Sequence, residues 1–119
     1  MAMTFQVEIV LRERTYAVTE RIRHTGNDPP SWTEQDVESV LKAILLAIDR
    51  AKHPEGTAGY VALRGFSWIV EPSDGGVVIA IEIPSGAAVA GPFGIEQARL
   101  DRMITNVIAA AAPSRPVVH

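Results

Sequence analysis

Residues 66–83 read FSWIVEPSDGGVVIAIEI, and this stretch decides the fold. Apolar residues occupy every second position on both sides of Ser73–Gly76, which is the pattern of two half-buried strands. The dipeptide Asp74-Gly75 is typical of a two-residue type I′ hairpin turn. Turn and alternation independently favour the same hairpin, with Trp68 buried beneath helices. The register predicts these facing pairs: Val70 and Ile79, Trp68 and Ile81, Phe66 and Ile83.

A second hairpin is predicted near the N-terminus. Apolar residues fall on odd positions within residues 5–11 and on even positions within residues 16–22. One strand would need a bulge to change parity, whereas a reversal of the chain explains the change directly. The turn at Arg12–Thr15 lacks Gly and Asn, which favours a loose loop. The expected facing pairs are Leu11 and Tyr16, Ile9 and Val18, and Phe5 and Ile22.

Two amphipathic helices complete the predicted elements. Thr33 is a favourable N-cap, and apolar residues recur at helical spacing from there to Lys52, where His53-Pro54 ends the helix. The second helix is predicted over residues 95–112, before Pro113.

The loop over residues 24–32 contains Gly, Asn, Asp and a Pro pair. Trp32 at its end either fastens this loop to the first helix or is an exposed recognition residue.

Residues 84–94 are rich in Ala and Gly and are predicted to be a loop, whereas residues 60–63 are predicted to be a short strand with a bulge at Gly65. The element order is then ββαββα. We expect an α+β two-layer sandwich, a four-stranded antiparallel sheet with both helices on one face. The expected strand order, 1-2-4-3, resembles a permuted ferredoxin-like plait in topology alone. Residues 1–113 are expected to form this single domain, and residues 114–119 a flexible tail.

Composition limits the classes of partner. The 119 residues include 14 acidic and 11 basic side chains, for a net charge of −3, and no cysteine. A mildly acidic chain disfavours nucleic acid and anionic membranes, and the absence of cysteine excludes disulfides and thiolate sites. The first hairpin carries several arginines, but nearby glutamates nearly cancel their charge, so nucleic-acid binding is not expected. The arginines of the first hairpin are Arg12, Arg14, Arg21 and Arg23.

The sequence has no signal-peptide pattern and no long apolar run. We therefore expect a soluble cytoplasmic protein of the bacterial type, without a membrane span.

Recognisable catalytic and metal motifs are missing. The three histidines have no metal-ligand spacing, and the loop histidines among them are expected at the surface. Ser85 is not in a Gly-x-Ser-x-Gly elbow, and the Gly-rich segment lacks the P-loop and dinucleotide fingerprints. We therefore predict no catalytic residue, no metal site and no cofactor, and leave open whether the chain is an enzyme.

One candidate surface is the sheet face that the helices would leave uncovered. It carries Ile69, Val78, Ala80 and Glu82, an apolar group with one carboxylate. Such a face is typical of a dimer interface or a shallow ligand site, so the preferred function is a non-enzymatic interaction domain that forms a homodimer. Glu82 is either a solvated carboxylate or a buried acid or base.

The alternative function is a small enzyme or ligand-binding protein with an anion pocket. The expected topology gathers Arg14, His53, Ser85 and Gly94 at one end of the sheet, where free N–H groups of the second helix would face a carboxylate or phosphate. The competing interpretation is that Gly94 only shapes the entry to that helix and that Glu96 occupies the helix dipole.

Overall fold

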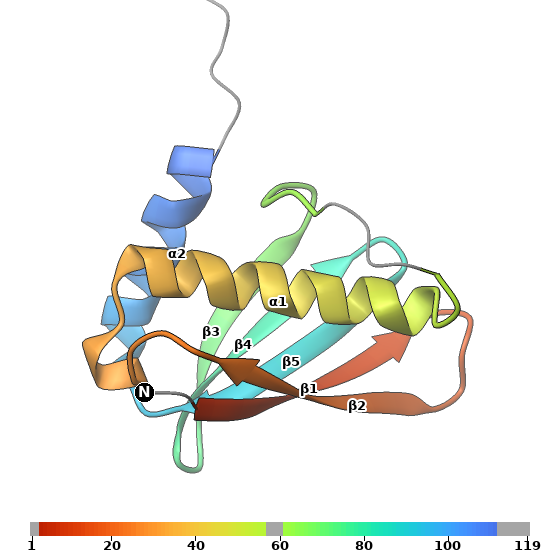
Figure 1. Cartoon of the computed structure of the whole chain (residues 1–119), viewed down its shortest axis with the longest axis horizontal. Helices are drawn as coiled ribbons and strands as arrows, with labels where there is room; N and C mark the ends of the chain where they lie inside the picture. Colours follow the sequence, from red (N-terminus) through yellow and green to blue (C-terminus); the bar gives the residue numbers. More distant parts are fainter. Residues whose placement is uncertain (1–2, 57–60, 112–119) are drawn as a thin grey trace, which may run out of the picture.

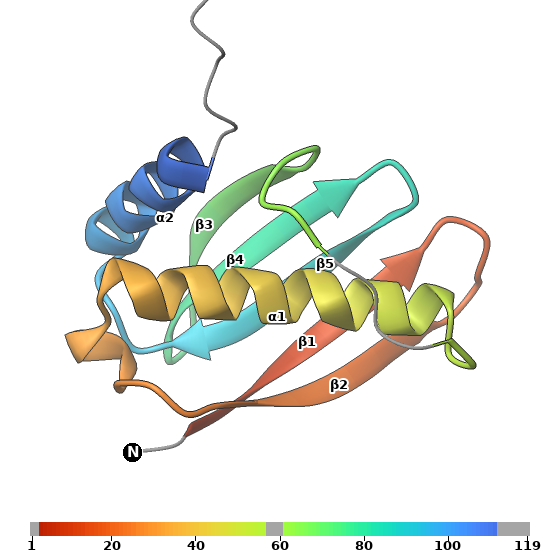
Figure 2. The same cartoon turned by 45° about the horizontal axis from the view of Figure 1, so that its top comes forward.

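The computed structural model describes residues 3–56 and 61–111. Five strands and two α-helices form an α+β fold in which both helices lie on the same side of one sheet (Figures 1 and 2). The elements are β1 (Met3–Leu11), β2 (Ala17–His24), the short 3-10 turn η1 (Pro29–Ser31), α1 (Glu34–Lys52), β3 (Ser67–Ser73), β4 (Gly76–Ile83), β5 (Gly86–Phe93) and α2 (Gln97–Ala111).

The hairpin predicted from residues 66–83 is confirmed. Strands β3 and β4 are joined by Asp74-Gly75, and Trp68 faces Ile81 as expected. The turn type differs from the expected type I′, which needs a positive φ at both central residues. Gly75 has a φ of +88°, which glycine adopts without strain, but no described residue other than glycine has a positive φ, so Asp74 does not. A positive φ at the second central residue alone is the pattern of a type II turn. Trp68 is only partly buried against the core, so it is less enclosed than the pattern suggested.

The N-terminal hairpin is also confirmed, with Phe5 opposite Ile22 and Ile9 opposite Val18. Its turn is a loose loop in which the Arg14 N–H donates to the Leu11 carbonyl at 3.0 Å. Strand β2 extends to His24, which is buried, so the expectation of a surface histidine in a loop is wrong at this position.

The predicted loop over residues 84–94 is wrong: most of it is strand β5. This strand lies in the middle of a five-stranded antiparallel sheet with the order β2-β1-β5-β4-β3. The inward side chains of β5 include Ala88 and Ala90, which are almost completely buried. A central strand is hydrogen-bonded on both edges, so it needs no β-branched residues to form.

This fifth strand corrects the predicted topology. The sheet is not four-stranded, its strand order is not 1-2-4-3, and the expected permuted ferredoxin-like plait is not formed. The element order becomes ββαβββα. Residues 61–66 form no strand, which corrects the described part of the prediction for residues 60–63. Residue 60 and the predicted tail, residues 114–119, lie outside the described residues.

Helix α1 begins and ends as predicted. Thr33 is its N-cap, and a capping box links the Thr33 hydroxyl to the Asp36 N–H and the Asp36 carboxylate to the Thr33 N–H. Helix α2 starts two residues later than predicted, because Ile95 is buried in an irregular segment before it. Its Gln97 amide donates to the Val70 carbonyl at 2.9 Å, which fastens α2 to the β3 edge of the sheet.

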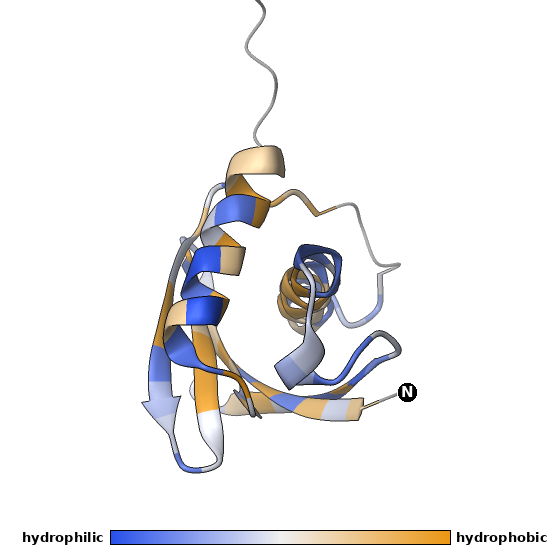
Figure 3. Ribbon diagram, turned by 90° about the vertical axis from the view of Figure 1, so that its left-hand side faces the viewer, coloured by the Kyte–Doolittle hydropathy of each residue, from blue (hydrophilic) through white to orange (hydrophobic). Residues whose placement is uncertain are grey.

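The core lies between the sheet and the two helices. Figure 3 looks at the molecule from its left-hand side in Figure 1 and shows both helices on the inner side of a curved sheet, while the outer face stays uncovered. Within residues 3–56 and 61–111, neither helix is long and apolar enough to cross a membrane.

Candidate functional site

The predicted surface residues lie together on the uncovered face of the sheet. Ile69 is 53% exposed and stands opposite Ala80, which in turn stands opposite Val89 of β5. Val78 and Ala80 are half-buried, and Glu82 is exposed. We call this surface the open face. It consists of the outward positions of the five strands.

The sequence prediction missed part of the open face. Val10 and Val89 are 49% and 42% exposed, and both belong to it. Val10 stands opposite Ala87, and Val89 opposite Glu8, so the apolar surface continues from β3 across β4 and β5 to β1. Residues 87–90 read Ala-Ala-Val-Ala, which shows no apolar and polar alternation, so the sequence offered no clear signal for this part of the face. Of the four large apolar side chains exposed in the described residues, only Tyr16 lies elsewhere, in the loop before β2.

Charged groups at the two sides of the open face differ in sign, while Glu8 on β1 lies nearer its centre, opposite Val89. Arg21 and Arg23 lie on edge strand β2, and Glu71 and Glu82 lie on β3 and β4 at the other side. In the described parts of the chain, none of these four side chains forms an ion pair. Glu82 is a solvent-exposed carboxylate whose cross-strand neighbours are Ser67 and Ala87, neither of which is a titratable proton partner.

Three of the four residues predicted for the anion pocket meet at one end of the sheet. Arg14, His53 and Ser85 line a cavity of about 470 Å³, which we call the end pocket. The β1–β2 turn, the β4–β5 turn and the C-terminal end of α1 surround it. Its other lining residues are Leu11, Arg12, Glu13, Lys52 and Pro84.

Gly94 is not part of this cavity. Strand β5 runs from Gly86 to Phe93, so Ser85 and Gly94 lie at its opposite ends, roughly 30 Å apart at strand geometry. The start of α2 therefore faces away from the end pocket, and its free N–H groups do not contribute to it. The expected site at the N-terminus of the second helix is not formed. Residues 84–94, predicted to be a loop, mostly form strand β5, which carries the chain from one end of the sheet to the other.

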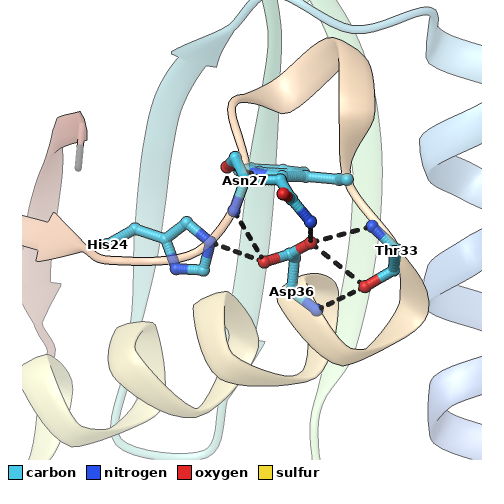
Figure 4. Close-up of polar contacts among 5 residues, drawn as sticks. His24, Asn27, Thr33 and Asp36 are labelled. Carbon is cyan, nitrogen blue, oxygen red and sulfur yellow. Dashed lines mark hydrogen bonds and ion pairs between the residues drawn. The ribbon is translucent and has the colours of Figure 1, made fainter. Parts of the chain in front are cut away.

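A buried polar cluster at the other end of α1 was not predicted at all (Figure 4). The Asp36 carboxylate accepts hydrogen bonds from His24 Nε2 at 3.1 Å, from Asn27 Nδ2 at 2.8 Å and from the Thr33 N–H at 2.9 Å. The Asn27 N–H and the Thr33 hydroxyl add two further hydrogen bonds, each 3.1 Å long. Trp32 is 1% exposed, and its indole N–H donates to the Asn27 carbonyl at 2.8 Å, so this tryptophan fastens the loop and is not an exposed recognition residue.

Asp36 remains ionised in this environment. Burial raises the pKa of Asp36, but the hydrogen bonds from Thr33 and Asn27 outweigh burial and hold that pKa well below its usual range. Gly26 packs so closely that a Cβ on it would lie 2.0 Å from Asp36 Oδ1 and 2.6 Å from His24 Nε2. The cluster therefore depends on a glycine at this position.

The imidazole of His24 is held in one orientation beside a polar cavity of about 390 Å³. All fully buried side-chain nitrogens and oxygens of the described residues have a partner, so His24 Nδ1, for which no partner is observed, keeps access to solvent. Within residues 3–56 and 61–111, no serine or threonine hydroxyl is hydrogen-bonded to His24. The cluster thus fastens the β2–α1 connection and lacks the nucleophile of a catalytic triad.

Comparisons with family models, with curated proteins and with solved structures found no match. Among the described residues, no group of three or more His, Cys, Asp or Glu side chains is arranged to hold a metal ion. The two surfaces with chemistry of their own are the open face, which suits a flat apolar partner, and the end pocket, which suits a small ligand.

Proposed function

We propose that this chain is a small interaction domain that forms a homodimer through the open face. The observation that carries the proposal is the continuous apolar surface from Ile69 through Ala80 and Val89 to Val10 and Ala87. Soluble monomers rarely leave an extended apolar patch uncovered, and polar or charged groups at its margin are the usual form of an interface.

The charges of the open face favour a second copy of the chain as the partner. Strands β2 and β3 are the two edges of the sheet, with arginines on β2 and glutamates on β3 and β4. A twofold axis parallel to β5 and between two stacked sheets places β2 of each copy over β3 of the other. Arg21 of one protomer then approaches Glu71 of its partner, and the same contact occurs twice, as an isologous interface requires.

Twisted sheets of the same hand stack well face to face, about 10 Å apart, with their outward side chains between them. On this axis the two β5 strands face each other at the centre, where the small Ala87 leaves room for Val89 of the opposite copy. Burial of apolar area supplies the affinity, and the separated charges select the orientation.

A matched pair of substitutions tests the interface. Val89→Lys places a charge at the centre of the open face, next to Glu8, which can accept it in the monomer. Tyr16→Lys places the same charge on an exposed apolar residue outside that face. Sedimentation velocity should show a dimer for the wild type and for Tyr16→Lys, and a folded monomer for Val89→Lys. A wild type that is monomeric at high micromolar concentration would refute the proposal.

We also expect the protein to act in the cytoplasm. The chain has no cysteine, so it gains nothing from an oxidising compartment and depends on packing alone. Fractionation of cells that express it at its natural level, with detection by antibody, tests this expectation.

A further inference from the structure

The end pocket combines an apolar floor with an excess of positive charge. Leu11 is 6% exposed and, with Pro84, forms the apolar part of its lining. Arg12, Arg14 and Lys52 line the same cavity, with Glu13 as the opposing carboxylate. Its volume of about 470 Å³ lies within the range of small-molecule sites.

The cations of the end pocket are not engaged in ion pairs within the described part of the chain. In contrast, two other cations of α1 are paired, Lys42 with Glu38 at 2.7 Å and Arg50 with Glu20. Arg14 Nη1 lies 3.4 Å from the Tyr16 hydroxyl, a distance at the limit of a hydrogen bond, so its guanidinium keeps its other donors available. An arginine fork matches the two oxygens of a carboxylate.

The backbone around the pocket is held in place by hydrogen bonds between its turns. The Arg12 N–H donates to the Ser85 carbonyl at 3.0 Å, which ties the β1–β2 turn to the β4–β5 turn. The His53 N–H donates to the Asp49 carbonyl at 2.9 Å and closes the last turn of α1. The walls that carry the cations are thus fixed before a ligand arrives, which lowers the entropic cost of binding.

We propose that the end pocket binds a small organic carboxylate with an apolar body. The carboxylate lies between the guanidinium of Arg14 and the ammonium of Lys52, while the apolar body covers Leu11 and Pro84. Arg12 adds long-range attraction, and the Ser85 hydroxyl and the His53 ring offer hydrogen bonds at the rim. Inorganic phosphate can pair with the cations but does not cover Leu11 and Pro84, which stay in contact with water. It should therefore bind more weakly than a carboxylate with an apolar body.

Three probes separate the two contributions: hexanoate, hexanol and inorganic phosphate. In a titration of the ¹⁵N-labelled full chain at low salt, hexanoate should cause saturable amide shifts in residues 11–14 and 52–53. Hexanol lacks the charge and phosphate lacks the apolar body, so each should bind about tenfold more weakly or worse. Equal binding of hexanol would show a merely apolar crevice, and equal binding of phosphate a merely electrostatic one; either result would overturn the proposal.

Substitutions complete the test. Arg14→Gln and Lys52→Gln should each weaken hexanoate binding about tenfold, since each removes a charged hydrogen-bond donor. Arg102→Gln removes an exposed cation of α2, far from the pocket, and should leave binding unchanged. Because these three side chains are at least partly exposed, the variants should fold, and their amide spectra would verify it. No saturable shift with hexanoate up to about 50 mM, or equal losses in all three variants, would contradict a built carboxylate site.

Discussion

His24 at the end of β2 and Asp36 in the first turn of α1 are joined by a hydrogen bond of 3.1 Å, although twelve residues separate them in the sequence. Both side chains are buried, with exposed fractions of 8% and 9%. Asp36 also closes the capping box and holds both amide groups of Asn27. One carboxylate therefore fixes the end of a strand, a loop and the start of a helix.

Asp36→Ala should lower the free energy of unfolding by about 2–4 kcal/mol, because it removes a helix cap and leaves buried donors without an acceptor. Urea denaturation at one protein concentration measures this loss. The control is Glu38→Gln, which removes only a surface pair with Lys42 and should cost no more than about 0.5 kcal/mol. An Asp36→Ala variant as stable as the control would show that the cluster does not hold the fold.

The lowered pKa of Asp36 predicts a pH dependence of stability. In the unfolded chain this carboxyl has a pKa of about 3.9. Since its pKa in the folded state lies below that value, Asp36 contributes its full stabilisation above the unfolded pKa. The contribution is lost as the pH falls from there toward the folded pKa. The difference in urea midpoint between the wild type and Asp36→Asn should therefore be largest near neutral pH and shrink below about pH 4. A difference that grows on acidification would have the wrong sign for this account.

Gly26→Ala should separate His24 from Asp36, because the added Cβ would lie within 2.0 Å of the carboxylate oxygen. We expect a loss of at least about 2 kcal/mol in unfolding free energy. Gly94→Ala is the matched control, since a Cβ there would meet nothing within 4 Å. Gly94→Ala should be neutral or slightly stabilising, because alanine lowers the conformational entropy of the unfolded chain. If both alanines had the same effect on stability, the close approach at Gly26 would have no energetic consequence.

Substitutions at two alanines of β5, one facing the core and one on the open face, should differ in their effect on stability. Ala90 is fully buried between the sheet and the helices, so Ala90→Leu should overpack the core and cost about 1–3 kcal/mol. Ala87 lies on the open face, where Ala87→Val adds a β-branched residue to a strand and should change stability by less than about 0.5 kcal/mol. Thermal denaturation of both variants measures this difference. If residues 84–94 were the loop that the sequence suggested, neither substitution would change stability.

Local signals in the sequence were sufficient where two of them agreed. In residues 66–83 the turn dipeptide and the alternation specify the same register, and at α1 the N-cap, the apolar spacing and the terminal Pro specify the same helix. Strand β5 had neither signal, because most of its buried positions carry glycine or alanine, which give little hydrophobic pattern. Its stability comes from two hydrogen-bonded neighbours, which are far away in the sequence.

The same missing strand explains what could be predicted of the sites. Ile69, Val78, Ala80 and Glu82 were placed on one face because the hairpin register alone determines their side of the sheet. Gly94 was misplaced because its position depends on whether residues 84–94 turn back or cross the sheet. The pairing of His24 with Asp36 could not be predicted from local sequence patterns. It depends on how the loop between β2 and α1 folds back in space.

The most direct test of the homodimer uses a chain that has no cysteine of its own. Ala87→Cys puts one thiol on the open face of β5, next to the proposed twofold axis, and Arg102→Cys puts one on the exposed side of α2. With sheets stacked about 10 Å apart, a bismaleimide of similar length can join two Ala87→Cys chains. We predict that this reagent converts most of the Ala87→Cys protein, and little of the Arg102→Cys protein, into a covalent dimer at micromolar concentration. If Ala87→Cys reacts fully with the reagent but remains monomeric, the open face is not where two copies meet.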